Sequence, residues 1–181
     1  MSKIKTSLIA GLIAVGTFAG APAFAASYQV WNGTSWANSG TFTVTGPTTA
    51  TVAGIPIPCN VAVFTVTVTS GAAALTGANF NGSSNAACHG ISASASLSAP
   101  VAVSGSSSIK INVSGVTVTF PNPPATCSGG VGSGTLTNAN PNTGPANNNF
   151  TFAVTSFASG PCSNVKSTGN MVSNKPVRAV F

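Results

Sequence analysis

The stretch NVAVFTVTVTSG, residues 60–71, decides the fold class of this protein. Apolar side chains and threonines alternate along it: the apolar ones are Ala62, Phe64, Val66 and Val68, and threonine occupies positions 65, 67 and 69. A period of two is typical of a β-strand that buries one face and exposes the other to water. Exposed strand faces usually carry lysine and glutamate, whereas this face carries only hydroxyl groups. The sequence therefore predicts solvated strands that are almost without charge.

Strand patterns of the same kind recur along the chain between turn residues. The clearest of them are at residues 41–45, 108–120 and 150–157. Gly115 interrupts the second and indicates a bulge or a barrel corner. Two stretches rich in glycine, proline and asparagine, residues 121–134 and 137–149, predict loops. We expect an all-β protein of about eight to ten strands, arranged as an antiparallel β-sandwich or jelly-roll-like domain or as a small barrel.

The first 25 residues have the composition of a secretory signal peptide. Lys3 and Lys5 form a basic head, an apolar stretch follows at residues 8–18, and the sequence AFA at residues 23–25 is a cleavage site of the A-x-A type. An N-terminal membrane anchor is the alternative, but the apolar stretch is shorter than the roughly 20 residues that a membrane span needs. We expect cleavage after residue 25, a single β-rich domain over residues 26–181 without a transmembrane helix, and a secreted or cell-surface location.

The chain contains no aspartate and no glutamate, and its six lysine and arginine residues give a formal charge of +6. Two of these cations lie in the predicted signal peptide; the others are Lys110, Lys166, Lys175 and Arg178. Four dispersed cations do not neutralise a phosphate backbone, so we expect no nucleic-acid partner. With one histidine and no carboxylate side chains, few groups titrate between acidic and neutral pH. The free energy of unfolding should therefore barely depend on pH over that range.

The missing carboxylates also exclude the common catalytic sites. A Ser-His-Asp triad lacks its acid, glycoside hydrolysis needs two carboxyl groups, and magnesium or calcium needs anionic oxygen ligands. Cys88 and His89 are adjacent and raise the alternative of a zinc site, but no C-x-x-C pair accompanies them, and neighbours on a strand point to opposite faces. We expect no enzymatic activity, no metal and no cofactor.

An even number of widely spaced cysteines in an exported chain predicts two disulfide bonds. The residues concerned are Cys59, Cys88, Cys127 and Cys162. Three pairings are possible, and the sequence does not choose among them. We favour Cys59 with Cys88 and Cys127 with Cys162, because each bond then closes a loop of supersecondary size. Such bonds typically contribute about 2–4 kcal/mol each, which would partly replace the missing ion pairs.

The segment that follows the predicted cleavage site is a possible assembly strand, containing Tyr28, Val30 and Trp31. Uncharged strand faces lack the charges that normally prevent edge-to-edge pairing. Once the signal peptide is removed, this segment is free to add as a strand to a second copy of the chain. The alternative is that it pairs within its own sheet.

Several stretches together resemble the secreted alkane oxidation protein activator family. They are the AFA signal sequence, CNVAVFTVTVTSG at residues 59–71, ANFNGSSNAACHGI at 78–91, ATCSG at 125–129 and GPCSN at 160–164. The similarity covers most of residues 59–162. It does not include the Tyr28–Trp31 segment or the C-terminal residues 175–181. The resemblance implies extracellular support of growth on long-chain hydrocarbons and brings no catalytic residues.

Three functions are compatible with these observations. The first is an exported, non-enzymatic accessory for contact with an apolar substrate, with apolar or cell-surface material as its partner. The second is a subunit of an extracellular fibre or biofilm matrix, a homopolymer assembled by strand exchange. The third is a small outer-membrane β-barrel, which the final Phe181 favours and which the four cysteines, the scarcity of tryptophan and tyrosine and the lack of charged lumen residues disfavour.

Overall fold

Thirteen β-strands and one short 3-10 helix make up the part of the chain that the computed structural model describes, residues 26–140 and 146–181. The predicted signal peptide lies outside the described residues. Eight of the strands form a barrel: β3 (Gly40–Val52), β4 (Ile55–Thr69), β5 (Ala72–Asn79), β6 (Ser92–Leu97), β8 (Ile109–Pro121), β9 (Pro124–Leu136), β10 (Asn149–Ser156) and β11 (Cys162–Ser167). No helix within the described ranges has the length and hydropathy of a membrane span.

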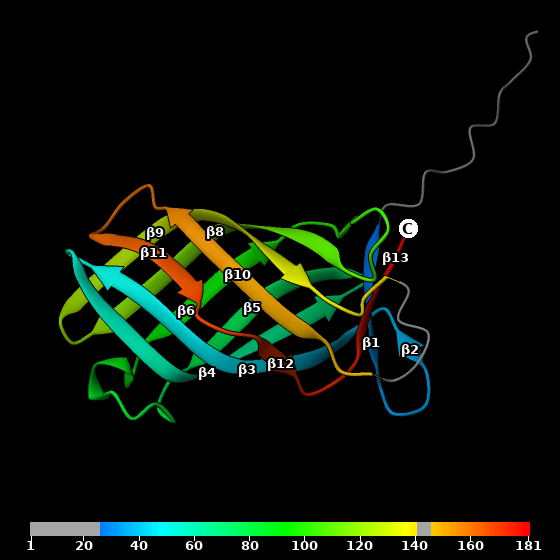
Figure 1. Ribbon diagram of the computed structural model, residues 1–181, viewed down its shortest axis with the longest axis horizontal. Helices are drawn as coiled ribbons and strands as arrows, with labels where there is room; N and C mark the ends of the chain where they lie inside the picture. The colour runs from blue at the N-terminus through cyan, green and yellow to red at the C-terminus, as the bar shows by residue number, and fades with distance from the viewer. Residues whose placement is uncertain (1–25, 141–145) are drawn as a thin grey trace, which may run out of the picture.

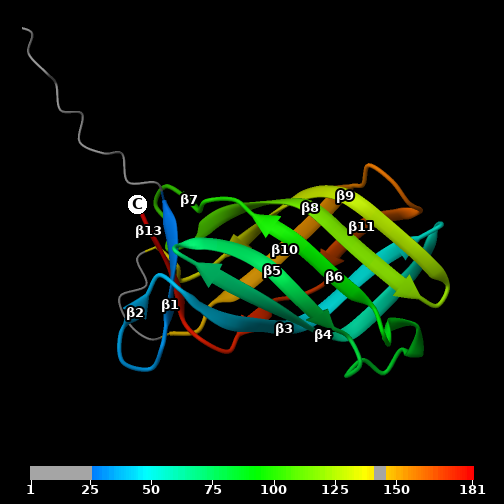
Figure 2. The same cartoon turned by 180° about the vertical axis from the view of Figure 1, so that it is seen from behind.

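Each barrel strand pairs antiparallel with the next barrel strand along the chain, from β3 to β11. The barrel closes because β11 also pairs with β3, where Cys162 lies opposite Val52 and Ser167 lies opposite Thr48. The prediction of an antiparallel all-β fold is confirmed. The closure makes the structure one continuous curved sheet instead of the two stacked sheets of a sandwich, as Figure 1 and Figure 2 show from opposite sides.

Two short strands complete the barrel wall. Strand β12 (Met171–Ser173) lies between β10 and β3, with Met171 opposite Phe150 and Val172 opposite Thr45. Strand β11 occupies the same interval nearer the other end of the barrel, so β11 and β12 share one position in the wall. Strand β7 (Val101–Ala102) pairs with the start of β8.

The barrel interior is filled by the apolar halves of the alternating strands. In β4 the even-numbered apolar residues from Ala62 to Val68 are all buried, as the pattern predicts. In β8 the buried positions are Ile109, Ile111 and Val113, and then Val116, Val118 and Phe120. The pairing register between β8 and β9 shifts between Val113 and Val116. Gly115 therefore marks a bulge, as predicted, and this bulge moves the inward face from odd to even positions.

Strand β9 corrects the prediction of a loop over residues 121–134. Three of its inward positions opposite buried residues of β8 are Gly130, Gly132 and Gly134, so apolar alternation is not visible there in the sequence. A Cβ atom on Gly134 would lie 2.7 Å from the ring of Phe150, and one on Gly130 would lie 2.7 Å from the ring of Phe157. Glycine is needed because these aromatic rings pack directly on the β9 backbone.

The two ends of the barrel differ. At one end, here called the sheet end, strands β1 (Ser27–Trp31) and β13 (Val177–Val180) run across the barrel opening, as Figure 1 shows. They form a small sheet in the order β13-β1-β2, with β2 at Trp36–Ala37. The other end, here called the disulfide end, carries the turns between β3 and β4 and between β8 and β9, together with the helix η1 (Ala86–Cys88). Both disulfide bonds lie toward this end.

Candidate functional site

The interior of the barrel contains a cavity of about 90 Å³. Its lining comes from all eight barrel strands and from β1, and it is apolar apart from Tyr28, Thr48 and Thr49. Within the described part of the chain, no charged side chain contributes to this lining. An eight-stranded barrel is just wide enough to be filled by side chains or to hold one small ligand. The cavity is therefore the first candidate for a binding site.

Four phenylalanine rings form a connected row inside the barrel. Phe64 of β4 makes edge-to-face contacts with Phe80 and with Phe152, at ring-centroid distances of 5.6 Å in both cases. Phe152 and Phe150 of β10 are stacked 5.9 Å apart. Phe80 is buried, whereas Phe150 and Phe152 are half-buried although they share a face with the buried Val154. The row thus runs from a closed region of the interior to a region that solvent reaches.

A shallow groove of about 470 Å³ lies where the row reaches solvent. Its lining is mostly small and hydroxyl-bearing and includes one cation: Ser133, Gly134, Thr135, Thr151, Phe152, Ala153, Lys166, Ser167, Thr168, Gly169 and Asn170. Phe152 lines both this groove and the internal cavity. Phe152 therefore lies in the wall that separates the two spaces.

The backbone ladder of the wall is interrupted beside Phe152. Strand β10 pairs with β11 at Ala153 and Val154, and with β12 at Asn149 and Phe150. Between these pairings, the Phe152 N–H donates to Ser167 Oγ at 3.0 Å, and that hydroxyl donates to the Phe152 carbonyl at 3.4 Å. One serine side chain thus replaces backbone pairing at this point of the wall.

The opposite side of the same gap is bounded by β3. There the Thr168 N–H donates to the Pro47 carbonyl at 3.0 Å, and Pro47 itself has no N–H to donate in return. We call this gap, bounded by residues 151–152, 167–170 and 46–47, the seam. It lies where the chain passes from β11 to β12, and the shallow groove covers its outer side.

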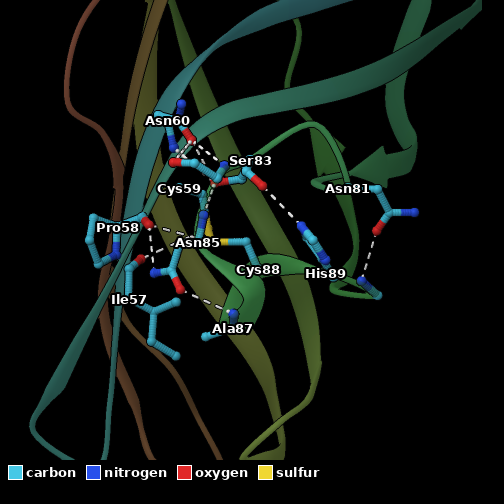
Figure 3. The surroundings of a disulfide bond; sticks show 12 residues. Ile57, Pro58, Cys59, Asn60, Asn81, Ser83, Asn85, Ala87, Cys88 and His89 are labelled. Carbon is cyan, nitrogen blue, oxygen red and sulfur yellow. Dashed lines mark hydrogen bonds between the residues drawn. A yellow bond between two sulfur atoms is a disulfide. The ribbon is translucent and has the colours of Figure 1, made fainter.

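The predicted cysteine residues all lie in disulfide bonds, in the favoured pairing. Cys59 of β4 joins Cys88 at the end of η1, and Cys127 of β9 joins Cys162 at the start of β11. Figure 3 shows the first bond with the polar loop around it. Asn60 Oδ1 accepts hydrogen bonds from the Ser83 hydroxyl and the Ser84 N–H, each at 2.8 Å. The bond and these contacts hold the loop of residues 80–91 against the strand.

The residues considered for a zinc site have other partners. His89 is exposed, and its Nε2 lies 2.9 Å from the Ser83 carbonyl, to which it donates (Figure 3). Asn85 caps η1 by accepting from the Ala87 N–H at 3.1 Å and donates to the Pro58 carbonyl at 3.0 Å. No group of three or more potential metal ligands occurs among the described residues.

The possible assembly strand lies inside the molecule in this structure. Strand β1 pairs with β13 on one side and with β2 on the other, which is the alternative considered above. Tyr28 and Val30 are each only 2 % exposed, and Trp31 makes an edge-to-face contact with Trp36 at 5.4 Å. Pairing with a second copy stays a prediction, and it would require β1 to leave at least one of its present partners.

Several residues that shape the interior were not singled out from the sequence. The alternation FTF at residues 150–152 indicates a strand but does not say which face is inside or that Phe152 borders solvent. Ser167 was one serine among many. Their roles follow from the pairing of β10, β11 and β12, which are separated by loops along the chain.

One of three comparisons with known proteins gives a match. The family model described as "Alkane oxidation protein activator PraA/PraB-like" matches residues 1–179. Neither a curated protein nor a solved structure matches the chain.

Proposed function

The chain belongs to the alkane oxidation protein activator PraA/PraB-like family, and on this basis we propose that it is an exported, non-enzymatic protein that assists contact between cells and long-chain hydrocarbon. The observation that carries the proposal is the distribution of polarity: the barrel has an apolar, uncharged interior, and its outward strand positions are mostly threonine and serine. Such a molecule offers an apolar interior to hydrocarbon, while its outer face remains compatible with water.

The absence of catalytic groups supports a non-enzymatic role. The sequence holds no aspartate or glutamate, and all four cysteines are oxidised. The single histidine is exposed on a loop, where its ring donates to a backbone carbonyl. General acid–base catalysis needs a titratable pair in a shielded pocket. Among the described residues, the lining of the barrel interior offers a buried tyrosine hydroxyl and no carboxylate, thiol or imidazole.

The outer surface supports action at an interface. On β3 and β4, Thr41 lies opposite Thr67 and Thr43 lies opposite Thr65, so neighbouring strands present a continuous hydroxyl face. Without carboxylates, this face carries no negative charge that a negatively charged cell surface would repel. Weak electrostatics would let the protein approach both cells and uncharged hydrocarbon droplets.

The polarity of the wall also bears on the outer-membrane alternative. A barrel that spans a membrane places an apolar band outside and polar residues inside. Here the buried alternating residues of β4 and β8 point inward, and the outward positions of β8 include Lys110, Asn112 and Thr119. This arrangement favours the accessory role. Cell fractionation checks it, because a membrane barrel would need detergent for its recovery.

Added-back protein tests the proposal most directly. Cells that lack this chain would receive the purified secreted protein, and oxygen uptake would be followed with hexadecane or with succinate as the carbon source. We expect faster uptake with hexadecane and no change with succinate, because only the first must be brought to the cell as a separate phase. Protein that has been reduced and unfolded is the control. An equal effect on both substrates, or none on hexadecane, would overturn the proposal.

Size and shape measurements address the fibre alternative. If the protein acts as a monomeric accessory, size-exclusion chromatography gives a single peak near the mass of one chain, and negative-stain microscopy shows no filaments. Filaments that form from the secreted protein would favour the matrix role through strand exchange.

A further inference from the structure

We infer that the barrel interior receives the methyl end of an unbranched aliphatic chain, which enters sideways through the seam and displaces the ring of Phe152. This inference rests on the proposed function for the source of the chain. The site and the route are argued from the interior and the wall themselves.

The interior selects for an apolar guest because it offers no unused polar group. The Tyr28 hydroxyl, which lines the cavity, donates to the Ser98 carbonyl at 2.8 Å. Among the described residues, no buried side-chain nitrogen or oxygen lacks a hydrogen-bond partner. A polar or charged group that entered would lose its hydration without gaining a partner. Only the hydrocarbon part of a molecule therefore belongs inside.

The volume of the cavity limits how much of a chain can enter. At about 90 Å³ it is smaller than a cavity of about 150 Å³, which binds benzene. A whole long-chain hydrocarbon does not fit. If the half-buried ring of Phe152 turns outward into the groove, the interior gains the space of one aromatic ring. That space suits the terminal methyl and a few methylenes, with the rest of the chain left in the groove.

Of three routes into the barrel, only the seam is closed by neither a covering sheet nor a disulfide bond. At the sheet end the opening is covered by buried residues of β1 and β13, including Val30 and Val177. At the disulfide end the loop of residues 80–91 is tied to β4 by Cys59–Cys88. At the seam, a single serine hydroxyl bridges the gap in the ladder, and one backbone hydrogen bond to Pro47 holds the far side. Opening the seam therefore requires breaking hydrogen bonds, without displacing β1 and β13 or the disulfide-bonded loop.

The groove provides a place for the part of the chain that stays outside. Its lining combines small residues, such as Gly134, Ala153 and Gly169, with the half-buried Phe152. Hydroxyl groups and Lys166 surround these residues. A polar head group at the far end of the chain would lie among them, in contact with water.

Methyl-resolved NMR of the full secreted chain tests the inference directly. The probes are 1-hexanol, 1-octanol and 1-decanol, which share a chain type and differ in length. The reporters are the methyl groups of Val66 and Val113, which line the cavity, compared with those of the exposed Val101 and Val131. We expect saturable shifts at the inner pair and little change at the outer pair. Affinity should rise about fourfold per added methylene until the interior is full, and then stop rising.

A charged analogue tests the orientation of the chain. Octanoate has the same hydrocarbon tail as octanol but a head group that is too costly to bury. Entry by the methyl end predicts that octanoate also shifts the inner valines, because its carboxylate stays in the groove. Shifts with octanol but not with octanoate would mean that the head group enters, and this orientation would be wrong.

Phe152→Ala and Phe181→Ala form a matched pair for the route. Both remove one phenylalanine ring, but Phe181 is exposed at the C-terminus, away from the cavity lining. We expect Phe152→Ala to bind octanol several-fold more tightly than the wild type does. In this variant the affinity should also continue to rise up to a longer alcohol before it levels off. Phe181→Ala should match the wild type in both respects. If Phe152→Ala does not fold, Phe152→Leu should show a smaller change in the same direction. Equal affinities for all folded variants would overturn the assigned route.

The outcomes separate this inference from the proposed function. Shifts confined to the outer valines, or no shifts at all, overturn the interior site even if the protein restores hexadecane oxidation. If the methyl signals of Val66 and Val113 shift saturably but the added protein does not change hexadecane oxidation, the interior site is supported and the proposed function is overturned.

Discussion

The two ends of the barrel are closed in different ways. At the disulfide end, Cys59–Cys88 joins β4 to the loop before β6, and Cys127–Cys162 joins β9 to β11. The bonds close loops with sequence separations of 29 and 35 residues. In the chain-entropy model, a disulfide bond that closes a loop of this length stabilises the fold because it lowers the conformational entropy of the unfolded chain. This end is therefore secured covalently.

At the sheet end, one buried amide connects four segments of the chain. Asn148 is 0 % exposed, and its Nδ2 donates to the carbonyls of Thr137 and Val177 at 2.8 and 2.9 Å. Its Oδ1 accepts from the Val177 N–H at 2.7 Å, and its own N–H donates to Ser173 Oγ at 2.8 Å. The segment before β10 is thereby joined to the end of β9, to β12 and to β13.

The difference shows how a chain without carboxylates fixes its long-range contacts. Ion pairs between side chains are impossible here, because the sequence has no acidic residue. Two covalent bonds and a fully paired buried amide take their place. Both are neutral, so neither end should respond to acid. Two kinds of substitution therefore test this comparison: one introduces a charge at the sheet end, and the other removes a disulfide bond at the disulfide end.

The largest effect is expected from Asn148→Asp, which breaks the sheet end. A carboxylate would face the carbonyls of Thr137 and Val177 and would lose both donated hydrogen bonds. At pH 7 we expect a loss of about 4 kcal/mol or more in the free energy of unfolding. Burial raises the pKa of the new carboxyl in the folded state above its unfolded value of about 4. The variant is therefore most stable below pH 4 and loses stability as the pH rises toward neutral.

Urea unfolding between pH 3 and pH 8 checks this expectation against the wild type. The wild type should give a nearly constant free energy of unfolding over that range, because few groups titrate in it. Asn148→Ser separates charge from the loss of hydrogen bonds, since it is destabilised by a similar amount at every pH. An Asn148→Asp variant with a flat pH profile would show that this position is not shielded from water.

The next largest effect is expected from breaking the disulfide end. Replacing Cys127 and Cys162 by alanine should lower the free energy of unfolding by about 3.5 to 4 kcal/mol, and replacing Cys59 and Cys88 should have almost the same effect, because the two loops are similar in length. Combining either pair with Asn148→Ser should give additive losses, since the ends lie far apart. Denaturant unfolding of the single and combined variants measures this, and strong non-additivity would show that the two ends are coupled.

The sequence predicts the disulfide end better than the sheet end, and the reason is physical. Cysteines have few roles in a chain that is predicted to be exported, so their number and spacing indicated two bonds, and the favoured pairing is the observed one. Asn148 stands between Asn147 and Asn149, and nothing local marks it as the buried one of the three. Its burial depends on β12 and β13, which come at least 23 residues later.

The barrel strands show the same contrast. The apolar and threonine alternation of β4 revealed its buried face, whereas β9 presents glycine inward and resembled a loop. Glycine gives no periodic signal, because its role there depends on the rings of Phe150 and Phe157 arriving from a later part of the chain. The interior cavity and the seam depend on the same pairing between distant strands, so neither was visible in the sequence.

The smallest effect is expected from Tyr28→Phe at the sheet end. Tyr28 is only 2 % exposed, and its hydroxyl donates to the Ser98 carbonyl at 2.8 Å. Removing this hydroxyl should therefore lower the free energy of unfolding by about 1 kcal/mol at neutral pH. Burial also raises the pKa of this hydroxyl in the folded state above its ordinary value. The raised pKa means that the neutral tyrosine contributes its full stability below pH about 10 and that this contribution is lost as the pH rises further.

Alkaline unfolding curves distinguish the two proteins. The wild type should lose stability more steeply above pH 10 than Tyr28→Phe, so the difference between them shrinks as the hydroxyl is forced to ionise. All other side chains are the same in both proteins, so their contributions cancel in the comparison. A difference that stays constant from pH 7 to pH 11 would mean that the Tyr28 hydroxyl reaches solvent, and the sheet end would then be a looser closure than the buried amide beside it implies.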